Sequence, residues 1–159
     1  MANSSTLTAA AEAVKDALNG APDGTFDAAF TAVRAYAPVY TVEALKTLRV
    51  TVVPKAIVRD RATRKSDDLT VSIDIAVQKQ LTATDDAAPG RIDNAEADAL
   101  MALVEAIAVY FRAARVPGYA AAASMSIEND PAWSQEHMAE KRCFTSVLTL
   151  TLRINQEIE

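Results

Sequence analysis

The residues best able to carry chemistry stand together in one short stretch, residues 58–68, which reads VRDRATRKSDD. Seven of its eleven positions are charged, and the chain on both sides alternates like a β-strand. Such a hairpin tip could bind nucleic acid through its arginines, hold a metal ion or run acid-base chemistry through Asp67 and Asp68, or contact another protein. The rest of the sequence decides among these uses.

Other residue types that support catalysis are sparse. His137 is the only histidine and Cys143 the only cysteine, so neither has a second ligand of its own kind at metal spacing. Paired aspartates, here at 67–68 and 85–86, are more typical of solvated turns than of metal sites. No glycine-rich phosphate loop is present. We therefore expect no enzyme activity, no metal and no cofactor, with His137 exposed in a loop and Cys143 a buried or half-buried structural thiol.

The charge balance argues against a nucleic-acid reader. The 159 residues carry 16 basic and 21 acidic side chains, a formal net charge of -5, whereas proteins that bind phosphates need the opposite sign. No apolar run reaches the length of about 18 residues that a membrane helix needs, and the N-terminal residues lack the pattern of a secretory signal. We expect one soluble domain over residues 1–159, made in the cytoplasm, with fraying at 1–5 and 155–159.

The charged stretch lies between the two expected strands of a long hairpin. Residues 48–58 alternate as far as Pro54, which indicates an edge position, a bulge or a bend. Residues 69–81 show the clearest alternation in the chain, with apolar side chains at every second position from Leu69 to Val77. One apolar and one polar face are typical of an antiparallel sheet.

Helical spacing of apolar residues predicts two helices, at 6–19 and 93–115. Residues 29–36 alternate like a strand, although their alanines equally allow a helix. Further strands are expected at 120–128 and 144–154, joined by a polar loop that can hold a helical turn. These elements predict an α+β fold, an antiparallel β-sheet with a long hairpin and two main helices packed on one face.

The aromatic residues divide into core and contact candidates. Tyr36 and Tyr110 are expected in the core. Trp133 lies in the polar segment ENDPAWSQEH, where a tryptophan either plugs back into its own domain or inserts into a neighbour. Both uses of Trp133 stay open at this point.

Four segments, in this order, resemble proteins from the tail-assembly region of phages and prophages. They are TLRVTVVPK (47–55), VSIDIAVQK (71–79), IDNAEADALMALVEAIA (92–108) and ENDPAWSQEHMAEKRCFTSVLTLTLR (128–153). With a first helix, a long hairpin, a second helix and closing strands, the layout is similar to that of the tail terminators of long-tailed phages. The resemblance covers residues 28–154 and contains no catalytic motif.

The resemblance implies a small structural subunit that forms a ring, usually of six copies, on the last ring of the tail tube protein. Such a homo-oligomer stops tube growth and presents a surface to head-completion or connector proteins, while DNA passes through its central hole without sequence-specific binding. It also implies a place in the tail and neck of the virion after assembly in the host cytoplasm, with no membrane contact.

Three alternatives stay open beside the tail terminator. The first is a head-tail connector or head-closure subunit that docks on the portal. The second is a small prophage metal-dependent nuclease that uses Asp67, Asp68 and Asp74. The third is a binding module directed at a host protein.

The hairpin tip is the expected contact surface, with Trp133 as a further contact residue. Its candidate residues are Arg59, Asp60, Arg61, Arg64, Lys65, Asp67 and Asp68. In a head-to-tail ring, arginines of one copy can meet aspartates of the next, because the two surfaces are different patches of one chain. Exposed ion pairs contribute about 0–1 kcal/mol each, so the tip sets register more than affinity. The alternative is a solvated hairpin end that keeps strand edges from aggregating.

Overall fold

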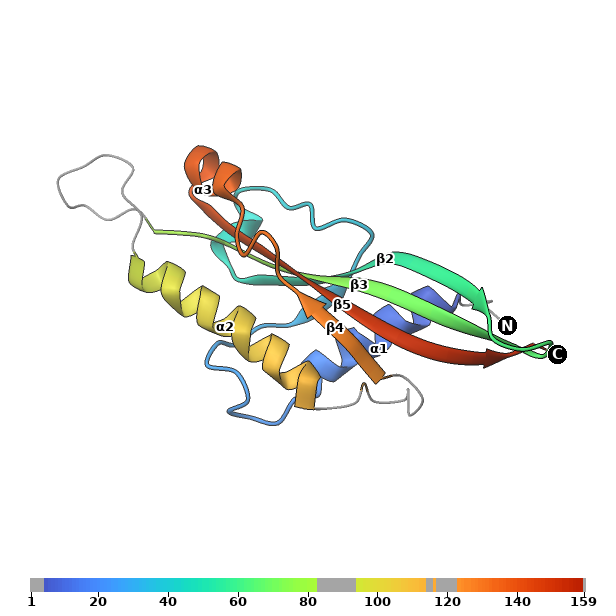
Figure 1. Ribbon diagram of the computed structural model, residues 1–159. Helices are drawn as coiled ribbons and strands as arrows, with labels where there is room; N and C mark the ends of the chain where they lie inside the picture. The colour runs from blue at the N-terminus through green and yellow to red at the C-terminus, as the bar shows by residue number, and fades with distance from the viewer. Residues whose placement is uncertain (1–4, 83–93, 114–115, 117–122, 159) are drawn as a thin grey trace.

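The computed structural model describes residues 5–82, 94–113, 116 and 123–158, and over them one sheet carries two long helices on one face (Figure 1). The strand order is β1-β2-β3-β5-β4, with β1 at Ala32–Arg34, β2 at Arg49–Arg61, β3 at Ser66–Gln80, β4 at Ala123–Glu128 and β5 at Cys143–Glu157. Neighbouring strands are antiparallel except β1 and β2, which run parallel. The expected α+β class is confirmed.

The central strand β3 follows the alternation expected from its sequence. Leu69, Val71 and Ile73 are fully buried toward the helices, whereas Thr70 and Ser72 on the other face are half-buried. The bulge indicated by Pro54 is present, because the register between β2 and β3 shifts between Pro54 and Ala56. This shift lets β2 continue along β3 although proline has no N–H to donate.

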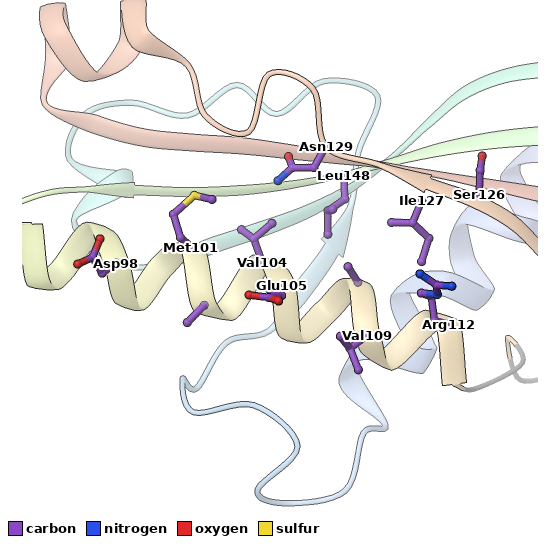
Figure 2. Close-up of a pocket in the computed structure, with 12 residues that line it drawn as sticks. Asp98, Met101, Val104, Glu105, Val109, Arg112, Ser126, Ile127, Asn129 and Leu148 are labelled. Atoms are coloured by element: carbon purple, nitrogen blue, oxygen red, sulfur yellow. The ribbon is translucent and has the colours of Figure 1, made fainter.

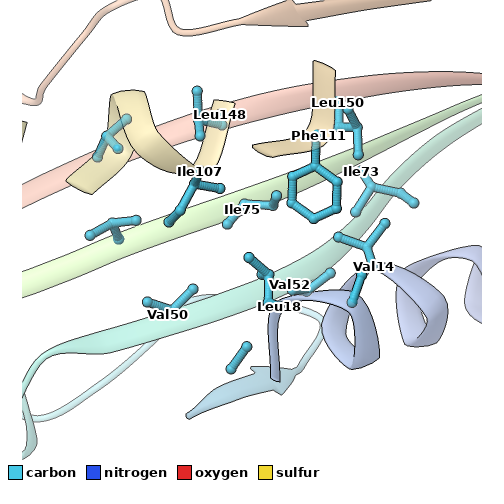
Figure 3. Close-up of a cluster of buried hydrophobic side chains, with 14 of the residues drawn as sticks. Val14, Leu18, Val50, Val52, Ile73, Ile75, Ile107, Phe111, Leu148 and Leu150 are labelled. Atoms are coloured by element: carbon cyan, nitrogen blue, oxygen red, sulfur yellow. The ribbon is translucent and has the colours of Figure 1, made fainter. Parts of the chain in front are cut away.

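Two helices cover the apolar face of the sheet. Helix α1 (Thr6–Asn19) begins at Ser5, whose hydroxyl accepts the Thr8 N–H at 3.1 Å, and α2 spans Asn94–Ala113. Val14 of α1 and Ile107 and Phe111 of α2 gather over the same buried sheet residues (Figure 3). The expected helices are thus confirmed over their described residues, while 93 and 114–115 lie outside them.

Tyr110 joins the two helices, since its hydroxyl donates to the Ala17 carbonyl at 3.0 Å and its ring meets Phe111 edge-on. Its expected packing against the core is confirmed. Tyr36 differs, because its side chain is 75% exposed. It follows the short strand β1, beyond which there is no sheet neighbour among the described residues to cover it.

Among the described residues, the second face of the sheet is covered only at one end. There the hydroxyl groups of Tyr40 and Thr51 lie 2.6 Å apart, next to the short 3-10 helix η1 (Ala44–Lys46). Helix α3 (Gln135–Lys141) covers the start of β5 at the same end, where the expected polar loop held only a helical turn. The sheet is therefore enclosed at this end, and half-buried or exposed polar residues line its second face toward the other end.

The strand expected at 29–36 is present but shorter, at Ala32–Arg34. The Asn19 side chain fixes its start, because its amide donates to the Ala32 carbonyl and its oxygen accepts the Ala32 N–H. The helix that the alanines also allowed does not form. The strand expected at 120–128 is described from Ala123 onward, and 120–122 lie outside the described residues.

The expected fraying of residues 155–159 does not occur at 155–157. Asn155, Gln156 and Glu157 form the end of β5 and pair with residues 66–68 of β3, and the Ile158 N–H donates to the Lys65 carbonyl at 2.7 Å. The long strand β3 supplies this partner, so the polar composition of 155–158 does not end the ladder. Residues 1–4 and 159, where fraying was also expected, lie outside the described residues.

Candidate protein-contact site on the arm

Three strands continue past the helices as a narrow ribbon that carries the charged stretch (Figure 1). We call residues 58–68 and 153–158 the arm. Leu69 is the last fully buried residue of β3 on this side, and residues 58–65 are exposed. At about 3.3 Å per residue, the four steps from Leu69 to Lys65 in the turn extend about 13 Å. A solvated arm of this length has polar backbone edges and side chains available to another molecule.

Two of the seven charged residues are used to hold the arm together. Asp68 accepts hydrogen bonds from Asn155 Nδ2 at 2.8 Å and Arg153 Nη2 at 2.6 Å. These bonds, first that of Asn155 and then that of Arg153, lower the pKa of Asp68, and Asp68 in turn raises the pKa of Arg153. Arg59 donates to Gln156 Oε1 at 3.3 Å. Both contacts attach β5 to the hairpin.

The other five charged side chains have no hydrogen-bond or ion-pair partner within the part of the chain that the structure describes. They are Asp60, Arg61, Arg64, Lys65 and Asp67. Asp60 stands directly opposite Asp68, an unfavourable pairing that the Arg153 charge offsets. Arg61 stands opposite Asp67, so both side chains lie on the same face of the arm.

Apolar side chains accompany these charges. Val58 is 53% exposed and Ile158 48% exposed. A surface that mixes unpartnered charges with exposed aliphatic groups suits a protein partner, because the apolar groups supply contact area and the charges set its register.

Trp133 is not brought to the arm. It precedes α3, at the opposite end of the sheet (Figure 1), and is 37% exposed. The segment that carries it is anchored to β5, because the Ser134 N–H donates to the Thr145 carbonyl at 2.9 Å. Trp133 and the arm therefore belong to separate surfaces. The indole is partly buried against its own domain and partly exposed to solvent.

The carboxylates of the nuclease alternative are dispersed. Asp68 and Asp74 lie on the same face of β3 but six residues apart, about 20 Å, and Asp67 points to the other face. Asp74 is engaged with the Thr149 hydroxyl at 2.7 Å and lies 3.7 Å from the Lys55 ammonium. Among the described residues, which exclude the aspartates at 85–86, no three metal-ligating side chains come together.

His137 is not the exposed loop residue expected from its polar surroundings. It lies in α3, half-buried, with Nδ1 2.9 Å from the Thr145 hydroxyl, because the Ser134 cap starts a helix that the loop composition concealed. Cys143 is buried as expected. Gln78 is buried on this same face, and its Oε1 has no partner within the chain as described.

A groove between α2 and β4 is a second candidate surface, which the sequence reasoning missed. One wall comes from α2, with Asp98, Glu105 and Arg112, and Ile127 and Leu148 of β4 and β5 lie opposite (Figure 2). The groove is open to solvent and encloses about 1000 Å³. Met101 and Val109 stand beside the core stripe of α2 and widen its apolar face, and this was the available signal in the sequence.

Comparison with protein-family models and with curated proteins finds no match to this chain. No helix among the residues that the structure describes is long and apolar enough to cross a membrane. The case for a function therefore rests on the geometry of the arm and the groove and on the resemblance in segment order.

Proposed function

We propose that the chain is a structural virion protein, a ring-forming tail terminator that caps the tail tube of a long-tailed phage. The observation that carries this proposal is the arm, which holds five charged side chains without partners in the described chain. The third strand β5 braces the arm, and a contact element that is already ordered loses less conformational entropy when it binds.

In this role several copies close into a ring through head-to-tail contacts, with the arm as one of the two surfaces of each contact. The ring sits on the last ring of tail tube protein and so prevents further tube subunits from adding. Its other side receives the head-completion or connector protein, and DNA passes through the central hole. The net charge of -5 on each copy suits a protein that DNA passes without being held.

The direct test measures oligomeric mass by native mass spectrometry, with the protein alone and with purified tail tubes. A ring, free or seated at the tube end in electron micrographs, is the expected result. A protein that stays monomeric alone and never decorates tube ends contradicts the proposal. A ring that binds portal-side complexes and not tubes identifies the head-tail connector instead.

The arm has its own test in the triple variant Arg61→Ser, Arg64→Ser and Lys65→Ser. The three side chains make no hydrogen bond or ion pair within the described chain, so the thermal midpoint is expected to stay unchanged while assembly weakens at least tenfold. The control removes three other exposed basic side chains with the same change in net charge, Lys46→Ser, Lys141→Ser and Arg142→Ser, of which only Lys46 has an ion-pair partner among the described residues, the exposed Glu43. Assembly that survives in the arm variant supports a merely solvated hairpin end.

A further inference from the structure

Within the described chain, two acidic side chains of the α2–β4 groove are free, whereas basic side chains outnumber acidic ones among the free charges of the arm. Asp98 and Glu105 stand on its α2 wall and have no hydrogen-bond or ion-pair partner among the described residues. They are seven residues apart, about 10 Å along the helix axis. At the tip, Arg61, Arg64 and Lys65 are likewise without side-chain partners in the described chain. Two free anions thus face outward at the groove, whereas the arm carries three free cations beside two free anions, Asp60 and Asp67.

The apolar content of the two surfaces also matches. Met101, Val109 and Ile127 line the groove beside its charges, and Val109 is exposed in the single chain. Val58 and Ile158 flank the charged tip of the arm and are exposed too. Contact between these groups removes aliphatic surface from water, which favours association.

Arg112 limits how the arm can lie in the groove. It stands at the C-terminal end of the α2 wall, seven residues and about 10 Å beyond Glu105. A basic tip is therefore expected near Asp98 and Glu105 rather than near Arg112. Ala102 lies between these two acids on the exposed side of α2, which places the predicted contact near the first half of the helix.

The arm of the same chain cannot fill this groove. Its three strands are continuous with β2, β3 and β5 through unbroken pairing, and the arm points away from α2 (Figure 1). A second copy of the chain carries the same basic tip and is free to bring it to the groove. Because arm and groove are different patches, the contact is head-to-tail and can repeat from copy to copy.

We propose that the arm of one copy docks in the α2–β4 groove of the next, with Arg61, Arg64 and Lys65 against Asp98 and Glu105. The proposal rests on the proposed ring, for which it names the two surfaces that meet.

Charge reversal tests the pairing. The arm variant carries Arg61→Glu, Arg64→Glu and Lys65→Glu, and the groove variant carries Asp98→Lys and Glu105→Lys. Each alone is expected to lose at least nine tenths of the wild-type oligomer in native mass spectra. An equal mixture of the two is expected to assemble again, because each reversed arm meets a reversed groove and each wild-type arm a wild-type groove. The control Glu136→Lys and Glu140→Lys, on exposed positions of α3, keeps the oligomer.

Disulfide capture provides a readout that does not need a stable ring. A chain with Thr63→Cys and Ala102→Cys is expected to give a ladder of covalent oligomers on mild oxidation, since a disulfide requires Cα atoms within about 7 Å. The control places the second cysteine on α3, as Thr63→Cys and Gln135→Cys, and is expected to stay monomeric. The native Cys143 is buried in both.

The outcomes separate this inference from the proposed function. If the groove variant assembles like wild type while the arm variant does not, the groove is not the seat of the arm and the ring proposal stands. If the mixture fails to assemble, or both cysteine pairs cross-link equally, the pairing is overturned. If the wild-type chain forms no oligomer alone or on purified tail tubes and no ladder appears, both proposals fall.

Discussion

Glu96 links the first turn of α2 to the end of β3. Its carboxylate accepts hydrogen bonds from Lys79 Nζ at 2.8 Å and from the Thr82 N–H at 3.0 Å. Burial raises the pKa of Glu96, but the Lys79 and Thr82 bonds outweigh burial, so the net pKa lies below its ordinary value. A carboxyl group whose pKa is lower in the folded than in the unfolded chain stabilises the fold above the ordinary pKa.

We predict that Glu96→Gln lowers the free energy of unfolding by about 1 kcal/mol at pH 7, because a neutral amide bonds Lys79 less strongly. The difference from wild type should shrink as the pH falls below the ordinary carboxyl range, where Glu96 in the wild-type chain is protonated as well. Urea unfolding at pH 7 and pH 3 measures it. The exposed Glu140→Gln serves as control, and an equal loss at both pH values contradicts the ionic explanation.

Gln78 is expected to cost stability rather than to add it. Its buried Oε1 lacks a partner in the described chain, and an unsatisfied buried acceptor costs about 1–3 kcal/mol. Gln78→Met keeps the length of the side chain and removes the polar atoms, so we predict a gain of about 1 kcal/mol in urea unfolding. Gln80→Met, at a half-buried position of the same strand, should change stability by less than about 0.5 kcal/mol. A loss in Gln78→Met would indicate a water or a partner at this atom.

The sequence predicted correctly those helices and strands whose formation depends on residues close together in the chain. The apolar alternation from Leu69 to Val77 predicted β3. Pro54 indicated an edge position, a bulge or a bend, and the register shows a bulge. Elements that depend on distant partners were missed or misjudged. Residues 155–157 join β5 only because β3 extends beside them, and Tyr36 is exposed because no strand follows β1 at that edge among the described residues.

The candidate site divides in the same way. The charged stretch was recognisable as a hairpin tip because it lies between two alternating segments. The ties that brace it, from Asp68 to Arg153 and Asn155, join residues more than 80 positions apart in the chain. The α2–β4 groove likewise depends on the pairing of β4 with β5. No local pattern along the chain indicates that pairing.

The third strand of the arm should control its rigidity. In a chain that ends at Ile154, residues 66–68 lose their strand pairing with 155–157. Asp68 also loses its hydrogen bond from Asn155, and Arg59 loses its hydrogen bond to Gln156. We predict that amide hydrogens of residues 58–68 then exchange at least tenfold faster, while those of Ile73 and Ile75 in the core do not change. Hydrogen exchange with mass spectrometry measures this. Gln156→Ala, which keeps the backbone pairing, is the control and should have a much smaller effect.

Across the whole molecule, two electrostatic effects act on assembly in opposite directions. Each copy carries a net charge of -5, so copies repel one another at long range, whereas a basic arm tip and an acidic groove attract at short range. Salt screens both, since the Debye length falls from about 10 Å at 0.1 M to about 3 Å at 1 M. The sign of the salt effect therefore shows which one governs the approach of two copies.

We predict that local attraction governs, because the free charges of the arm reach about 13 Å ahead of the core and meet the groove before the bodies of the two copies approach. The rate of assembly, followed by light scattering after dilution from mild urea, should fall about tenfold between 0.1 and 1 M NaCl. The rate of dissociation should change little, since aliphatic contacts are not screened. In the Arg61→Ser, Arg64→Ser and Lys65→Ser variant only the net repulsion remains, so added salt should speed its slower assembly. Faster assembly of the wild-type chain in 1 M NaCl would show that repulsion dominates and that the arm does not guide the encounter.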